Sequence, residues 1–141
     1  LIVGSATLTG DVSGFAILGL HATGQEAVVP LEARSASSYW LTYDNTNSMA
    51  TGFALANSTA VGGYVRLTFR DEAGALLGTS DSIVEPYGHA SFVLADRFGI
   101  TAGRRGTIEA APPPGGNISM IGLRFTPAGT FTTLPILETR H

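Results

Sequence analysis

The stretch GYVRLTFRDEAGALLGTS, from Gly63 to Ser80, carries the strongest fold signal in the sequence. Its first half alternates apolar and polar residues with a period of two, the spacing of a β-strand that has one buried face. The apolar positions are predicted to be buried: Val65, Leu67 and Phe69. The polar positions Arg66 and Arg70 are predicted to be exposed. Asp-Glu-Ala-Gly at 71–74 then predicts a hairpin turn, because Asp opens turns and Gly accepts a positive φ.

Short runs of this kind fill the rest of the chain, separated by Gly-, Asn- and Pro-containing turns. The predicted strands are residues 5–10, 14–20, 26–33, 38–43, 51–57, 81–86, 89–94, 106–111, 117–125 and 130–137. Only residues 94–99 have the character of a helical turn, and no long helix is predicted. Short strands at regular intervals predict an all-β protein, an antiparallel β-sandwich of immunoglobulin-like or jelly-roll-like type. We expect residues 1–141 to form one such domain.

Composition excludes several classes of protein. The chain has 141 residues, no Cys and a net charge of -3, and all eight basic residues are Arg. A chain of this length can bury its own core without disulfides. A negative chain without a basic cluster does not fit a nucleic-acid partner, and its apolar runs are too short to span a bilayer. Few charged residues and an N-terminal residue other than Met suggest a processed or excised secreted β-protein.

The two ends of the chain resemble one another. GLHATGQEAVVPLEAR at residues 19–34 is similar to GLRFTPAGTFTTLPILETR at residues 122–140, and the likeness extends to units 4–34 and 106–140. The central part, residues 35–105, has no second copy. Two interpretations remain open besides chance: one sandwich with internal pseudo-symmetry, or a window across a longer array with a period of about 100 residues.

Pro30 and Pro135 lie inside strand-like runs, where the missing N–H is tolerated at a sheet edge. These runs are therefore predicted to be edge strands, which can pair with another chain. The candidate assembly edges are Ser5, Ala6, Thr7, Leu8, Val29, Leu31, Leu134 and Ile136. We hypothesise that they join copies head to tail, since a contact that does not close on itself builds a filament.

The search for chemistry predicts no catalytic residue, no cofactor and no metal. No nucleophile elbow, zinc-binding His-Glu-x-x-His helix, phosphate loop or dinucleotide fingerprint occurs. The three histidines are scattered. Asp-Asn-Thr-Asn-Ser at residues 44–48 offers oxygen atoms but lacks the spacing of a calcium loop, so it is interpreted as an Asx turn between strands.

Clustered aromatic residues are the candidate ligand platform: Tyr39, Trp40 and Tyr43. Strand alternation places the two Tyr and Leu41 on one face and Trp40 on the other. If Leu41 is inward, Trp40 is the exposed ring. If Trp40 is inward, as its large area favours, the two Tyr are exposed.

Several motifs between residues 36 and 137 resemble a domain that recurs in large secreted and cell-surface proteins of bacteria, often beside immunoglobulin-like modules. They are YDNTNSMATGFALAN, VRLTFRDEAGALLGT, GHASFVLADRFGITAGRRGTIE, ISMIGLRF and GTFTTLPIL. The resemblance implies export, a sandwich-like module and a role in surface architecture or adhesion. It implies no activity and no catalytic residues.

Two alternative functions are therefore expected. The first is a non-catalytic structural or adhesive module of an exported surface protein, with self-association or neighbouring surface domains as partners. The alternative is a carbohydrate-binding module that stacks a polysaccharide on exposed aromatic rings. Both place the protein outside the cell or at its surface.

Overall fold

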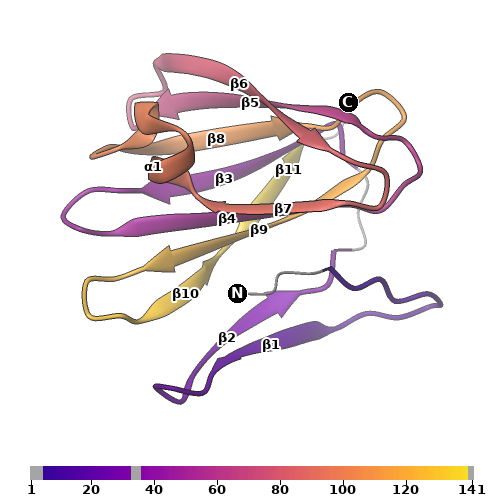
Figure 1. Cartoon of the computed structure of the whole chain (residues 1–141), viewed down its shortest axis with the longest axis horizontal. Helices are drawn as coiled ribbons and strands as arrows, with labels where there is room; N and C mark the ends of the chain where they lie inside the picture. Colours follow the sequence, from indigo (N-terminus) through magenta and orange to yellow (C-terminus); the bar gives the residue numbers. More distant parts are fainter. Residues whose placement is uncertain (1–4, 33–35, 140–141) are drawn as a thin grey trace.

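The computed structural model describes residues 5–32 and 36–139, which form three antiparallel sheets (Figure 1). The strands are β1 (Phe15–Leu20), β2 (Gln25–Pro30), β3 (Ser38–Asp44), β4 (Ala50–Asn57), β5 (Gly63–Asp71), β6 (Leu76–Val84), β7 (His89–Val93), β8 (Arg105–Ala111), β9 (Ile118–Phe125), β10 (Phe131–Leu134) and β11 (Ile136–Thr139). One helical turn, α1 (Leu94–Arg97), is followed by the 3₁₀ turn η1 (Gly99–Thr101).

Two of the sheets form a sandwich. Its four-stranded sheet has the order β10-β9-β4-β7, and its five-stranded sheet has the order β11-β3-β8-β5-β6. The core between them holds apolar side chains of both sheets that are almost completely buried, including Tyr39, Phe53, Leu55, Phe69 and Ile108. The predicted all-β sandwich is confirmed. No helix in the described part of the chain is long and apolar enough to cross a membrane.

The hairpin that gave the strongest sequence signal is formed by β5 and β6. Val65, Leu67 and Phe69 are at most 1% exposed, as the alternation predicted. Arg66 is exposed, but Arg70 is only half-exposed, and its guanidinium donates to the Gly74 carbonyl at 3.2 Å. The turn also follows the prediction, since Gly74 has a φ of 83°.

The strand predicted for residues 130–137 is divided at Pro135. Leu134 ends β10, which pairs with β9, and Ile136 begins β11, which pairs with β3 in the other sheet. Proline has no N–H to continue a ladder, so the chain changes sheets there. Both strands are the edge strands of their sheets, which confirms the predicted edge position.

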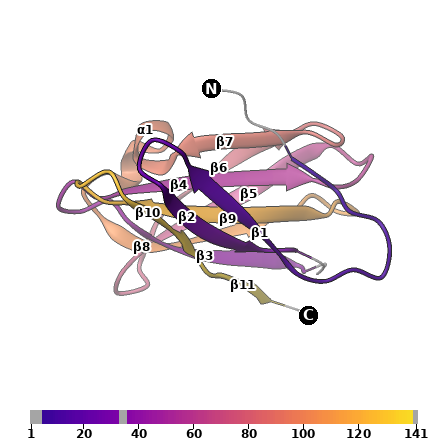
Figure 2. The same cartoon turned by 90° about the horizontal axis from the view of Figure 1, so that it is seen from below.

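The N-terminal segment stays outside the two sheets of the sandwich. Residues 5–14 contain no strand, so the strand predicted at residues 5–10 is wrong. β1 and β2 pair only with each other and lie along the four-stranded sheet, nearest β10 (Figures 1 and 2). The Gln25 amide connects them to that strand: the Phe131 N–H donates to Gln25 Oε1 at 3.0 Å, and Gln25 Nε2 donates to the Phe131 carbonyl. The two similar units therefore do not occupy equivalent positions of one sandwich.

Candidate functional site

The β1–β2 hairpin has one face toward the sandwich and one face away from it. On the near face, Ala27 is only 7% exposed, and its cross-strand partner is Leu18. On the far face, Phe15 is 64% exposed, Ile17 56% and Val28 49%. Ile17 and Val28 are cross-strand partners, so these side chains form a continuous apolar strip. We call Phe15, Ile17 and Val28 the hairpin strip. Large contiguous apolar surfaces mark contacts with another polypeptide, a ligand or a membrane, which makes this strip a candidate contact surface.

The hairpin strip corresponds to core positions of the sandwich. When Gly19 is aligned with Gly122, Phe15 falls on Ile118 and Ile17 falls on Met120. Ile118 is 1% exposed and Met120 is 8% exposed. The same strand pattern is therefore buried in β9 and open to solvent in β1.

The two aligned glycines have opposite surroundings. A Cβ at Gly122 would overlap the side chain of Leu41 and would lie 3.1 Å from Leu134 Cβ. A Cβ at Gly19 would meet nothing within 4 Å. Close packing therefore requires glycine in β9 but not in β1.

The two hairpins differ in how long their strands remain paired. β1 pairs with β2 as far as Phe15 and Pro30. β9 loses β10 after Gly122 and Leu134, where Pro135 redirects the chain. In the sandwich, the chain therefore passes from one sheet to the other at Pro135. β2 ends at Pro30 and has no second sheet to join among the described residues.

A groove of about 420 Å³ separates the N-terminal segment from the outer face of the four-stranded sheet. Five of the eight predicted edge residues line it: Ser5, Ala6, Leu8, Val29 and Leu31. The opposite wall is lined by small and apolar residues of β4 and β9, including Ala54 and Ile121. Leu134 and Ile136 lie in an adjacent pocket beside Val29 and Leu31, and Thr7 lines a third pocket beside Asn117. The structure thus brings the two predicted edges next to each other within one chain.

The predicted aromatic platform is mostly buried. Tyr39 is 0% exposed and Tyr43 is 3% exposed, so neither can stack a sugar. Burial raises the pKa of Tyr43, and its hydroxyl donates to the Arg70 carbonyl at 3.2 Å. Leu41 is inward as well. Trp40 therefore points outward and is half-buried, which corrects the expectation that the single Trp belongs to the core.

On the outer face of the five-stranded sheet, Trp40 has one charged and one apolar neighbour. Its cross-strand neighbours are Glu109 on β8 and Leu137 on β11. Better exposed rings lie elsewhere: Tyr64 is 63% exposed on β5, and Tyr87 is 67% exposed in the loop after β6. The sequence analysis did not select either ring, because neither lies in the aromatic cluster at residues 39–43.

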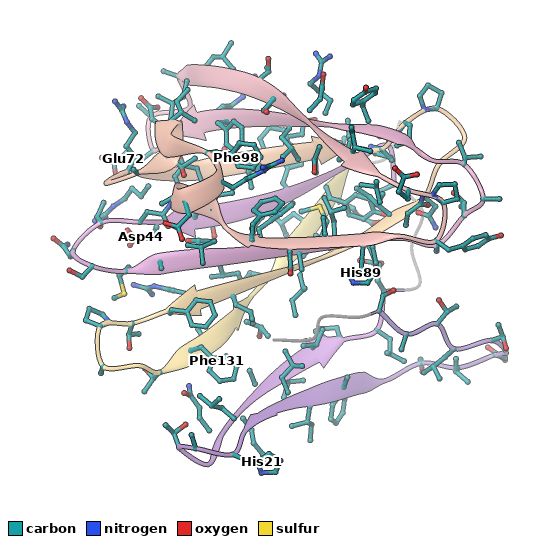
Figure 3. The ribbon with its side chains drawn as sticks, in the orientation of Figure 1. His21, Asp44, Glu72, His89, Phe98 and Phe131 are labelled. Carbon is teal, nitrogen blue, oxygen red and sulfur yellow. The ribbon has the colours of Figure 1, made fainter. Side chains whose placement is uncertain are left out.

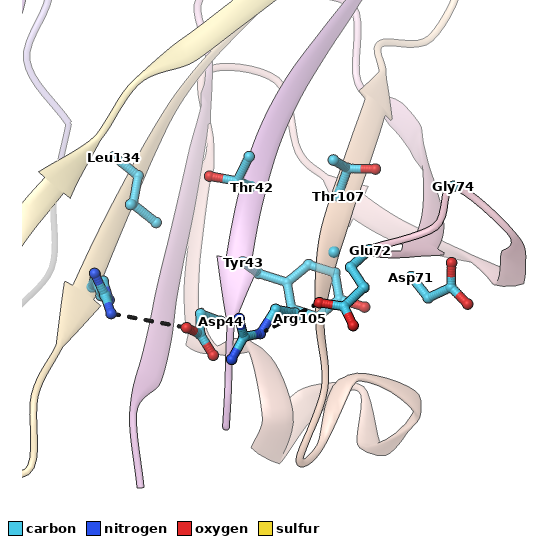
Figure 4. A pocket seen from close by; sticks show the side chains of 11 residues that line it. Thr42, Tyr43, Asp44, Asp71, Glu72, Gly74, Arg105, Thr107 and Leu134 are labelled. Carbon is cyan, nitrogen blue, oxygen red and sulfur yellow. Dashed lines mark ion pairs between the residues drawn. The ribbon is translucent and has the colours of Figure 1, made fainter. Parts of the chain in front are cut away.

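A charged cleft of about 440 Å³ lies at the end of the five-stranded sheet beside the β5–β6 turn (Figure 4). Arg124 lies 3.8 Å from Asp44, and Arg105 lies 3.6 Å from Glu72. Hydrogen bonds from the Thr46 hydroxyl and N–H hold the pKa of Asp44 below its usual value. The Asp44 carboxylate is thus stabilised in its charged form, which does not suit a general acid. Sequence reasoning missed this cleft because its residues come from five separate segments.

The loop at residues 44–48 is the predicted Asx turn. Asp44 Oδ1 accepts from the Thr46 N–H at 3.0 Å and from the Thr46 hydroxyl at 2.6 Å. The Asn45 side chain is 7% exposed, and its Oδ1 is occupied within the protein, since it accepts from the Thr51 N–H at 2.9 Å. In residues 5–32 and 36–139, no three His, Asp or Glu side chains gather as a metal site would require.

The histidines lie on separate elements (Figure 3). His21 is in the turn between β1 and β2, and His89 begins β7. His141 lies outside the described residues. The described histidines therefore do not converge on the charged cleft.

Comparisons with protein-family models, with curated proteins and with solved structures found no match to this chain.

Proposed function

We propose that the protein is a non-catalytic structural or adhesive module of an exported bacterial surface protein, which associates head to tail with other modules through its terminal strands into an extracellular filament. The observation that carries this proposal is the hairpin strip on a hairpin that lies outside the sandwich. Fully burying Phe, Ile or Val contributes about 1.5–3 kcal/mol per side chain, so covering this strip would favour association.

The edge strands support the same proposal. β10 and β11 each lie at an edge of a sandwich sheet, and β2 pairs with β1 on one side only. Edge strands present backbone N–H and C=O groups to which a neighbouring strand can bond. Lys residues commonly prevent such pairing at edges, and this chain has none. The sequence resemblance to a bacterial surface domain is the support for export and for the location.

Sedimentation velocity over a range of concentrations tests the proposal. We expect the intact chain to associate as its concentration rises, and Ile17→Asp to weaken association at least tenfold. Ile83→Asp is the matched control, because Ile83 is 60% exposed on β6 and lies outside the hairpin. An intact chain that remains monomeric at high concentration, or equal effects of the two substitutions, would contradict the proposal.

Carbohydrate binding is the second candidate, favoured by the outward position of Trp40 and by the exposed rings of Tyr64 and Tyr87. Trp40 is the single Trp of the chain, so its fluorescence reports directly on that surface. A saturable fluorescence change with soluble xylan or cellulose oligosaccharides is expected if sugar binds at Trp40. Binding measured in a calorimeter should then be abolished in Trp40→Ala and retained in Tyr64→Ala and Tyr87→Ala. Unchanged fluorescence and no heat of binding would eliminate this candidate.

A further inference from the structure

We propose that residues 5–32 are strand donors that complete a second β-sandwich, whose other strands come from an incomplete module of the same fold as residues 35–105. In that module, residues 5–10 would take the place of β8, and β1 would take the place of β9. The proposal deepens the proposed function, on which it rests, by naming the surface that the hairpin strip contacts.

The first support is the pattern of residues 5–10. When Gly4 is aligned with Gly106, Ala6 falls on Ile108 and Leu8 falls on Ala110. Both β8 residues are 0% exposed, because β8 lies between β3 and β5. Leu8 is 63% exposed, and its segment has no neighbouring strands to pair with. The alternation of a central strand is thus present where no strand forms.

The second support is β1 itself. Its alternate positions are those of a core strand, and Gly19 stands where Gly122 makes room for Leu41. In the surroundings that β1 has here, the apolar positions are not buried and no side chain packs against Gly19. If β1 lay beside a β4-like strand and across from a β3-like strand, its apolar side chains would be buried. Gly19 would then make room for a leucine of the β3-like strand.

The number of strands decides the kind of partner. The chain contains two sets of segments resembling β8–β11 but one set of β3–β7, in residues 35–105. In a second copy of this chain, β4 is already paired with that copy's own β9 over its whole length, Ala50 to Asn57. If the N-terminal segments of one copy replaced β8–β11 of another copy, the displaced β8–β11 strands would be left without partners. Such an exchange would bury no additional strands. Strand donation therefore needs an acceptor that lacks β8–β11 of its own, whereas intact copies can associate through the hairpin strip without donating strands.

The near face of the hairpin fits the same arrangement. Ala27 is buried against the first sandwich, and Gln25 is bonded to Phe131 of β10. Because successive side chains of a strand point to opposite faces, one face of the hairpin can fill the second core while the other stays on the first sandwich. The two sandwiches would then pack side by side.

An extended chain tests this proposal. Residues 35–105 are joined ahead of residue 4 of the full chain, so that Arg105 is followed by Gly4 as it is by Gly106 in the native sequence. We expect two folded sandwiches, with the denaturant dependence of unfolding raised about twofold, since it scales with the surface exposed on unfolding. Ile17→Asp in the extended chain should remove the added dependence and leave that of the native sandwich.

An added segment that stays unfolded, that makes the extended chain aggregate, or that is unaffected by Ile17→Asp would overturn the proposal. As a second measurement, residues 35–105 are supplied as a separate polypeptide and titrated into the intact chain. We expect binding that Ile17→Asp weakens at least tenfold and Ile83→Asp does not. Failure of both experiments while the intact chain still associates through the hairpin would refute strand donation and leave the proposed function in place.

Discussion

The β1–β2 and β9–β10 hairpins have similar sequences and opposite surroundings. In β9, the inward side chains Ile118 and Met120 meet the core of a sandwich, whereas Phe15 and Ile17 of β1 face solvent. A strand pattern specifies which face is suited to burial, but the neighbouring strands decide whether burial occurs. An isolated two-stranded hairpin is marginally stable in water, so β1 and β2 depend on whatever covers them.

The largest expected difference comes from the same substitution in the two hairpins. Ile118→Ala should destabilise the sandwich by about 2–5 kcal/mol, because it leaves a cavity in a closed core. Ile17→Ala should change the free energy of unfolding by less than about 0.5 kcal/mol, because Ile17 is exposed. Denaturant unfolding of both variants measures the difference. Similar losses would show that β1 belongs to the cooperative core.

A smaller difference is expected at the aligned glycines. Gly122→Ala should cost about 1–3 kcal/mol, because the new methyl group overpacks Leu41 and Leu134. Gly19→Ala should be neutral or slightly stabilising, since nothing surrounds it and Ala restricts the unfolded chain. Thermal unfolding of the two variants checks this pair. If Gly19→Ala were as costly as Gly122→Ala, the open surroundings of β1 would be wrong.

The charged cleft contributes a pH-dependent effect. Asp44 has a lowered pKa in the folded protein, so its contribution to stability is present above the unfolded value of about 4 and is lost as pH falls through the folded value. The difference in unfolding free energy between the native chain and Asp44→Asn should therefore shrink as pH falls below about 4. Thr46→Val, which removes the hydroxyl donor, should weaken this pH dependence. A constant difference across the acid range would contradict the assignment.

The smallest effect is expected on the solvent face of β5. Arg66 forms an ion pair with Asp81 at 2.5 Å, but the two side chains are 60% and 41% exposed. Exposed ion pairs contribute little, so Arg66→Ala should cost less than about 0.5 kcal/mol, against about 3–5 kcal/mol for Phe69→Ala on the other face. Chemical denaturation of both variants measures the contrast. Comparable losses would reverse the assignment of the two faces.

Features that depend on the local residue pattern could be predicted from the sequence. Features that depend on which strands lie beside a segment could not. Val65, Leu67 and Phe69 could be placed because alternation with a period of two marks one buried face. The strand predicted at residues 5–10 was wrong for the opposite reason: its alternation is that of a central strand, but a strand forms only against neighbours. Trp40 was misplaced because a large area favours burial in general, whereas Tyr39 and Leu41 determine which face of β3 is inward.

The charged cleft was beyond sequence reasoning, because its charged residues come from both sheets and become neighbours only when the sheets stack. Asp44 ends β3, Glu72 lies in the β5–β6 turn, Arg105 begins β8, and Arg124 lies on β9 of the other sheet. The hairpin strip shares no residue with the assembly edges predicted from the sequence, although it lies in one of the segments that the repeat singled out. The repeat between the ends of the chain identified the segments, and Pro135 identified an edge. That the hairpin strip faces solvent required the structure, since either face of β1 could have been packed against the sandwich.

Amide hydrogen exchange of β1 and β9 tests the central claim most directly, because it reports whether each strand belongs to a closed core. In the intact chain under conditions without association, we predict that β1 amides exchange at least about 100-fold faster than those of β9. In the extended chain, protection of β1 should rise to that of β9. Protection of β1 equal to that of β9 in the intact chain, or no gain in the extended chain, would contradict the account.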